Sequence, residues 1–147
     1  MDDSIVVGTD GSETAKQAVS EAVRLAKALG AQVHVVSAYE PVHAKVTGAP
    51  EGAAKVWQPL PHDHVDGILD QAVAGVRVAG VDVTPHAIRK DPADALIAVA
   101  DEVGATMIVV GSKGMHGARR LALGNVPNKV SHHARCNVLI VATDGKG

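Results

Sequence analysis

A glycine-spaced segment in the last third of the chain has the residue types best suited to chemistry. Gly111 and Gly114 follow an apolar run directly, and Gly124 stands before a helical pattern. Glycine has no Cβ, so backbone N–H groups around it can approach phosphate oxygens closely. A helix opening at Gly124–Val126 would add N–H groups and the positive end of a dipole. The spacing therefore suits a loop that wraps a polyphosphate, and glycines that only form turns are the alternative.

The charge around this segment favours an anion. From Val103 to Thr143 the sequence contains no Asp or Glu, yet it carries five cations, namely Lys113, Arg119, Arg120, Lys129 and Arg135. Such a stretch generates a local field that attracts negative charge, although a solvated basic face is the alternative interpretation.

The elements that must position this loop follow from hydrophobic periodicity. Five apolar, β-branched runs predict strands at Ser4–Thr9, Gln32–Ala38, Val81–Ile88, Thr106–Val110 and Asn137–Ala142. Four segments with helical periodicity alternate with them, and Asp91-Pro92 is a helix-start signal. The order predicts one α/β domain over residues 1–147, a Rossmann-like, doubly wound, three-layer fold with a five-stranded parallel sheet in the order 3-2-1-4-5.

This topology selects two loops. The first and fourth strands become neighbours at the switch point, and ligands of such folds bind beyond the carboxyl ends of the strands there. The loops are Asp10-Gly11-Ser12 and Gly111–Asn125. Taken alone, Asp10 is equally well a turn former or a helix cap. The proline-rich stretch 40–61 fits no element and is interpreted as a flexible flap.

Three blocks of the sequence resemble the universal stress protein family, in its ATP-binding-motif type. They are Gly111-x2-Gly114-x9-Gly124, the start Ile5–Ser12 and the ending Val126–Val141. The similarity covers essentially the whole chain except residues 40–61. Asn125 departs from the family pattern, which has Ser or Thr after the last glycine. An amide can donate to phosphate but is bulkier than a hydroxyl.

The resemblance implies an adenine-nucleotide site. Asp10 would lie near the ribose or phosphates and help to hold Mg²⁺, and Ala38 would contact adenine through its backbone. The full set of implied binding residues is Thr9, Asp10, Ala38, Val110, Gly111, Lys113, Gly114, Gly124, Asn125 and Val126. The implied ligand is ATP, or AMP or cyclic AMP because Asn125 weakens the case for a triphosphate. The resemblance also implies a homodimer through the last strand, Asn137–Ala142.

Composition excludes other classes of function. Tyr39 and Trp57 are the only aromatic residues, which argues against nucleic-acid modules that stack bases. No apolar run approaches the length of a membrane span. Cys136 is the only cysteine, so no intrachain disulfide forms, and a cytoplasmic location is expected. The neighbouring histidines, His62 with His64 and His132 with His133, lack the further ligands of a structural metal site.

Three functions remain open at the level of sequence. The first is a nucleotide-binding regulatory module of the stress response. The second is a slow ATP-hydrolysing enzyme, although no general base or nucleophile accompanies the loop. The third is a dimeric interaction protein that binds no nucleotide, which the departure at Asn125 supports.

Overall fold

The computed structural model describes residues 3–39, 62–112 and 125–143. The five strands are β1 (Ser4–Gly8), β2 (Gln32–Ala38), β3 (Val83–Ile88), β4 (Met107–Gly111) and β5 (Asn137–Val141). The helices are α1 (Glu13–Leu29), α3 (His62–Val78), α4 (Pro92–Val103) and α5 (Asn125–His133). All strand pairs are parallel and the sheet order is β3-β2-β1-β4-β5, which confirms the predicted topology.

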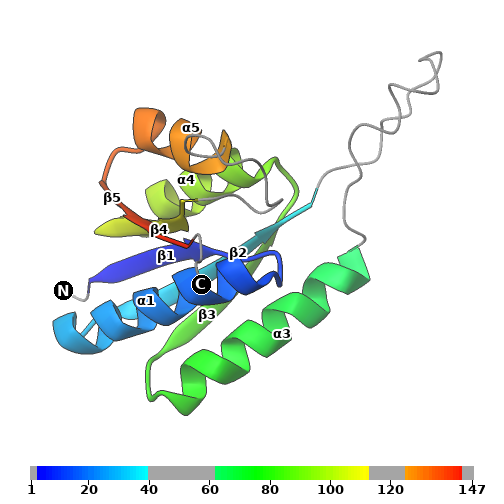
Figure 1. Ribbon diagram of the computed structural model, residues 1–147, viewed down its shortest axis with the longest axis vertical. Helices are drawn as coiled ribbons and strands as arrows, with labels where there is room; N and C mark the ends of the chain where they lie inside the picture. Colours follow the sequence, from blue (N-terminus) through cyan, green and yellow to red (C-terminus); the bar gives the residue numbers. More distant parts are fainter. Residues whose placement is uncertain (1–2, 40–61, 113–124, 144–147) are drawn as a thin grey trace.

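Helices cover both faces of the sheet. Figure 1 shows α1 and α3 on one face, with α4 and α5 on the other. Side chains from each strand alternate between two apolar clusters: Val7 of β1 packs with the α1 and α3 layer, and Val6 packs with α4 and α5. Because the central strands are buried on both faces, their sequences read as continuous apolar runs.

Local signals set the ends of two helices. Ser12 caps α1, and its Oγ accepts a hydrogen bond of 3.2 Å from the backbone N–H of the third helical residue. Asp91 caps α4 in the same way from the position before Pro92. Gly30 and Gly104 end these helices in the left-handed conformation, with φ of 69° and 64°. The start of α4 at Asp91-Pro92 is the one that the sequence predicts, whereas α1 is capped by Ser12 and not by Asp10.

Four strands have boundaries that differ by one or two residues from those predicted. Strand β1 ends at Gly8 rather than Thr9, and β4 spans Met107–Gly111 rather than Thr106–Val110. Strand β3 begins at Val83 because the Val81 N–H bonds the Val76 carbonyl and closes α3. Strand β5 ends at Val141 rather than Ala142. The chain leaves the sheet after Val141. Two residues later, the backbone N–H of Thr143 donates to the Ser112 side chain instead of to a neighbouring strand.

Two histidines meet across β2 and β3. The Nδ1 atom of His34 lies 3.0 Å from Nε2 of His86, and the ring centroids are 5.1 Å apart. One ring must donate and the other accept, so the contact requires at least one neutral imidazole. Burial lowers the pKa of both rings, and His86 lowers the pKa of His34 further, while Glu102 opposes the shift at His86.

Candidate functional site

The turn after β1 forms the first part of the site. Asp10 is half-buried, and its Oδ1 accepts a hydrogen bond of 2.9 Å from the Ser12 N–H. Thr9 is buried, and its Oγ1 accepts a hydrogen bond from the Gly11 N–H at 3.1 Å. None of the described residues bonds the second carboxylate oxygen of Asp10. The turn thus fixes the carboxylate and leaves one oxygen for a ligand.

Gly11 holds this turn in a conformation that favours glycine. Its φ is +84°, in the left-handed region. A Cβ built there would lie 3.3 Å from Cγ1 of Ile68, so α3 packs directly against the turn. The position of α3 and the shape of the Asp10 turn are therefore connected by van der Waals contact.

The end of β4 forms the second part. The Ser112 N–H bonds the Val141 carbonyl at 2.8 Å, and the Ser112 Oγ accepts from the Thr143 N–H at 3.1 Å. A Cβ at Gly111 would approach Cγ2 of Thr143 to 3.1 Å, so a glycine lets these two segments lie close together. The structure places Gly111 where its backbone leaves the sheet beside β1, as the sequence predicts.

Helix α5 contributes its N-terminus. It begins at Asn125, so the first backbone N–H groups, including those of Asn125 and Val126, have no acceptor within the helix. Pro127 supplies no N–H, which confines the donors to the very start of the helix. The Val126 side chain is half-buried and packs against the cluster beneath α4 and α5.

An ion-pair cluster joins α5 to α4. The Lys129 Nζ lies 3.5 Å from Oδ2 of Asp91 and 3.1 Å from Oδ1 of Asp94. Because Asp91 caps α4, this cluster links the start of α4 to the second turn of α5. Lys129 is thereby already neutralised by carboxylates and adds little to a field for anions, contrary to the simple count of basic residues in its stretch.

The end of β2 completes the sheet edge. Ala38 is half-buried, and the Tyr39 N–H bonds the Ile88 carbonyl at 2.9 Å, which holds β2 against β3 to its last residue. Just before it, Ser37 is almost fully buried. Among the described residues, Oγ of Ser37 is the one buried side-chain polar atom without a hydrogen-bond partner.

The predicted residues that are described converge on one edge. Strand β1 pairs with both β2 and β4, so Thr9, Asp10, Ala38, Val110 and Gly111 lie at the carboxyl ends of three adjacent strands. Val110 is buried in the core, and so it positions the loop rather than presenting a side chain. Lys113, Gly114, Gly124, the Asn125 side chain and the stretch 40–61 lie outside the described residues.

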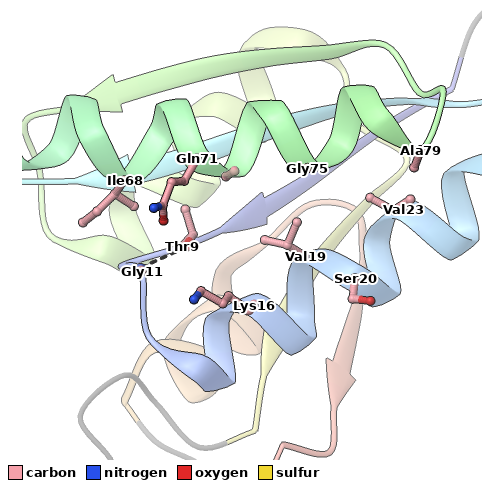
Figure 2. A pocket seen from close by; sticks show the side chains of 11 residues that line it. Thr9, Gly11, Lys16, Val19, Ser20, Val23, Ile68, Gln71, Gly75 and Ala79 are labelled. Carbon is pink, nitrogen blue, oxygen red and sulfur yellow. Dashed lines mark hydrogen bonds between the residues drawn. The ribbon is translucent and has the colours of Figure 1, made fainter.

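A pocket that the sequence does not predict lies beside this edge. It has a volume of about 570 Å³ and runs between α1 and α3. Figure 2 shows its side chains in two rows along the helices, with Thr9 and Gly11 at one end. The spacing of two helices is a tertiary property, and the only sequence signal is small residues, such as Ala72 and Gly75, on one side of α3.

Cys136 is half-buried beside the start of β5. Burial raises the pKa of the Cys136 thiol, which disfavours the thiolate that a nucleophile needs. Within residues 3–39, 62–112 and 125–143, no three or more His, Cys, Asp or Glu side chains are grouped to hold a metal ion. In the same residues, no helix has the length and apolar character to cross a membrane.

Comparisons with known proteins agree with one another. The profile of the universal stress protein family matches residues 1–142. Universal stress protein Rv1636 of Mycobacterium tuberculosis is 37% identical over 144 residues, which cover 95% of this chain and 96% of that protein. Universal stress protein YxiE of Bacillus subtilis is 31% identical over 147 residues, covering 96% and 99%.

Solved structures share the fold. A universal stress protein in complex with cAMP superposes with a TM-score of 0.73 at 32% identity, covering 97% of this chain and 98% of that one. A universal stress protein from Archaeoglobus fulgidus in complex with dAMP gives a TM-score of 0.67 at 25% identity, covering 94% and 96%. With the family profile matching nearly the whole chain and relatives above 30% identity, the protein belongs to the universal stress protein family.

Proposed function

We propose that this protein binds an adenine nucleotide at the carboxyl ends of β1, β2 and β4, and that residues 1–147 act as one regulatory module of the cytoplasmic stress response. The observation that carries the proposal is the preformed Asp10 turn at the topological switch point. Its carboxylate is oriented by the Ser12 N–H while one oxygen stays available. Relatives solved with cAMP and dAMP support adenine as the base.

The donor set of the described residues fits a nucleotide. Asp10 offers a carboxylate oxygen for a ribose hydroxyl or for Mg²⁺ on the phosphates. The α5 N-terminus offers N–H groups and a positive dipole end for phosphate. Ala38 offers its backbone to adenine, and the nearby Ser37 hydroxyl has no hydrogen-bond partner among the described residues. Thr9 and Val110 shape this edge, and Gly111 with Lys113, Gly114, Gly124, Asn125 and Val126 completes the proposed phosphate path.

Asn125 bears on which nucleotide is bound. It replaces the hydroxyl residue that the family motif carries, at the position where the helix dipole meets the phosphates. We therefore place AMP or cyclic AMP beside ATP as the ligand. The two monophosphate complexes among the relatives support that choice.

Calorimetric titration with ATP, AMP and cyclic AMP, each with and without Mg²⁺, tests the proposal. The expected result is binding of at least one nucleotide with a dissociation constant well below about 1 mM, which corresponds to about −4 kcal/mol. The Asp10→Asn variant keeps an oxygen for the Ser12 N–H and removes the charge. Loss of affinity in Asp10→Asn, with unchanged thermal stability, assigns the carboxylate to the ligand. Dissociation constants weaker than about 1 mM for all three nucleotides would overturn the proposal.

A homodimer through β5 is the second part of the proposal. Strand β5 is the last strand of the sheet, and Val138, Leu139, Ile140 and Val141 are only partly buried. An edge strand with apolar side chains is suited to pairing with another chain. Light scattering at micromolar concentration should give twice the chain mass. A monomer under these conditions contradicts the dimer and leaves the nucleotide site untouched.

A further inference from the structure

The pocket between α1 and α3 meets the nucleotide site proposed above at Thr9 and extends from there along the two helices. It lies on the face of the sheet covered by these two helices, and its volume of about 570 Å³ is within the range of small-molecule sites. Figure 2 shows it as a groove between two rows of side chains, Val19 and Val23 on α1 and Ile68 and Gln71 on α3. Its long axis follows the helices, so its shape suits an extended ligand.

Small residues on α3 keep the groove open. Ala72 and Gly75 lie one turn apart on the side of α3 that lines it, and Ala79 follows directly after the helix. A Cβ built at Gly75 would meet no atom within 4 Å, so the groove is open space at its middle rather than a tight helix contact. Val19, Val23 and Ile68 are the larger apolar side chains of the lining, and burying a hydrocarbon chain against them would remove apolar surface from water.

The charge of the groove is at one end. Lys16 is the one charged residue that lines it, close to Thr9 and Gln71, and no acidic side chain does. The Nζ of Lys16 also lies 3.5 Å from Oε2 of Glu13, but both side chains are exposed, and such surface pairs contribute about 0–1 kcal/mol. The ammonium can therefore turn to another anion at low cost.

We propose that this groove is a second ligand site and that it takes an unbranched acyl carboxylate. The acyl chain lies along Val19, Val23 and Gly75, and the carboxylate pairs with Lys16. Gln71 adds an amide donor at the same end. The complementarity of one cation at the end of an otherwise uncharged, elongated groove distinguishes this ligand from a nucleotide, whose phosphates need several donors.

The test is a titration of the nucleotide-free full chain with dodecanoate below its micelle-forming concentration, followed by amide chemical shifts. The expected result is saturable shifts along α1 and α3 with a dissociation constant of about 1 mM or tighter. Dodecanol and dodecyltrimethylammonium serve as uncharged and cationic ligands of the same chain length. Both should bind more weakly, and equal binding of either would overturn the assignment of a carboxylate.

Two glycines of α3 provide a matched pair of variants. Gly75→Leu fills the groove, whereas Gly67→Leu places the same side chain on the same helix outside it, and neither new Cβ meets an atom within 4 Å. Both changes raise helix propensity alike, so folding is preserved. Gly75→Leu should weaken dodecanoate binding about tenfold or more, equivalent to at least 1.4 kcal/mol. Equal affinities in the two variants, or no saturable shift in the wild type, would overturn the site.

The role of the cation has its own control. Lys16→Gln should weaken dodecanoate binding about two- to fivefold, as expected for an exposed ion pair, and leave dodecanol unchanged. Lys27→Gln, a change on the same helix away from the groove, should alter neither. Because no nucleotide is present, these outcomes are independent of the function proposed above.

Discussion

Ile68 of α3 packs against Gly11 of the turn that positions Asp10, with only 3.3 Å between Cγ1 of Ile68 and the place where a Cβ of residue 11 would be. The same glycine has a φ of +84°. The turn is thus constrained twice, by its own backbone and by a side chain from a helix more than fifty residues away.

Substitution of Gly11 should therefore lower the free energy of unfolding by more than the strain of its left-handed backbone conformation alone would. Gly80 provides the control, since its φ is +86° and a Cβ there meets nothing within 4 Å. We expect Gly80→Ala to lower the free energy of unfolding by about 1–2 kcal/mol, from the left-handed conformation. Gly11→Ala should lower it further and also weaken nucleotide binding. Urea denaturation and calorimetry measure both, and equal losses of stability would show that the Ile68 contact has no effect.

Asn125→Ser should strengthen ATP binding. The substitution restores a small hydroxyl at the start of α5, where one additional hydrogen bond to phosphate is worth about 0.5–1.5 kcal/mol, or roughly two- to tenfold in affinity. AMP and cyclic AMP should gain less because they present fewer phosphates. Asn128→Ser, an exposed change on the same helix, is the control. An unchanged ratio of ATP to AMP affinity would contradict a phosphate contact at this position.

The His34–His86 pair should make stability depend on pH. Burial lowers the pKa of both rings in the folded state, so the unfolded chain binds more protons as the pH falls below about 6.5, the ordinary pKa of histidine. The stability present above this pH is lost as the pH falls towards the folded pKa values. Urea denaturation between pH 8 and pH 5 should show a steeper loss in the wild type than in the double variant His34→Gln, His86→Gln, and parallel curves would exclude the pair as the cause.

Ser112→Ala should destabilise the packing of residues 142–143 against the end of β4. It removes the acceptor for the Thr143 N–H, a part-buried hydrogen bond of 3.1 Å, at a cost of about 1 kcal/mol. Ser131→Ala removes an exposed hydroxyl on α5 that donates to the Asn128 carbonyl, and should change stability by less than about 0.5 kcal/mol. Chemical denaturation gives the free energy of unfolding of each variant. Similar losses of stability in the two variants would mean that the bond between Ser112 and Thr143 does not stabilise the end of β4.

Sequence patterns with a local cause predicted most of the fold. The helix start at Asp91, the strand that begins at Ser4 and the sheet order all follow from short-range chemistry or from general rules of chain topology. Boundaries were less predictable, since Val81 has strand-like chemistry but is used to close α3.

Features that depend on register or on helix spacing could not be predicted. His34 and His86 are 52 residues apart in the sequence. They meet because the register of β2 and β3 pairs His86 with Val36, two residues after His34 on the same face of the sheet. The groove between α1 and α3 depends on how far the helices stand from each other, which no window of sequence encodes. The Asp10 turn, in contrast, was predicted because its residues are contiguous.

The hydrogen bond from Tyr39 to Ile88 fixes the only tyrosine of the chain at the end of β2, directly after the residue proposed to contact adenine. The chain has one tyrosine, one tryptophan and no phenylalanine, so its near-ultraviolet absorption and fluorescence come almost entirely from these two residues. Tyrosine emission therefore reports on a single place in the molecule, at the edge of the sheet where the nucleotide is proposed to lie. Occupancy of that edge can be followed optically in the unlabelled wild-type chain.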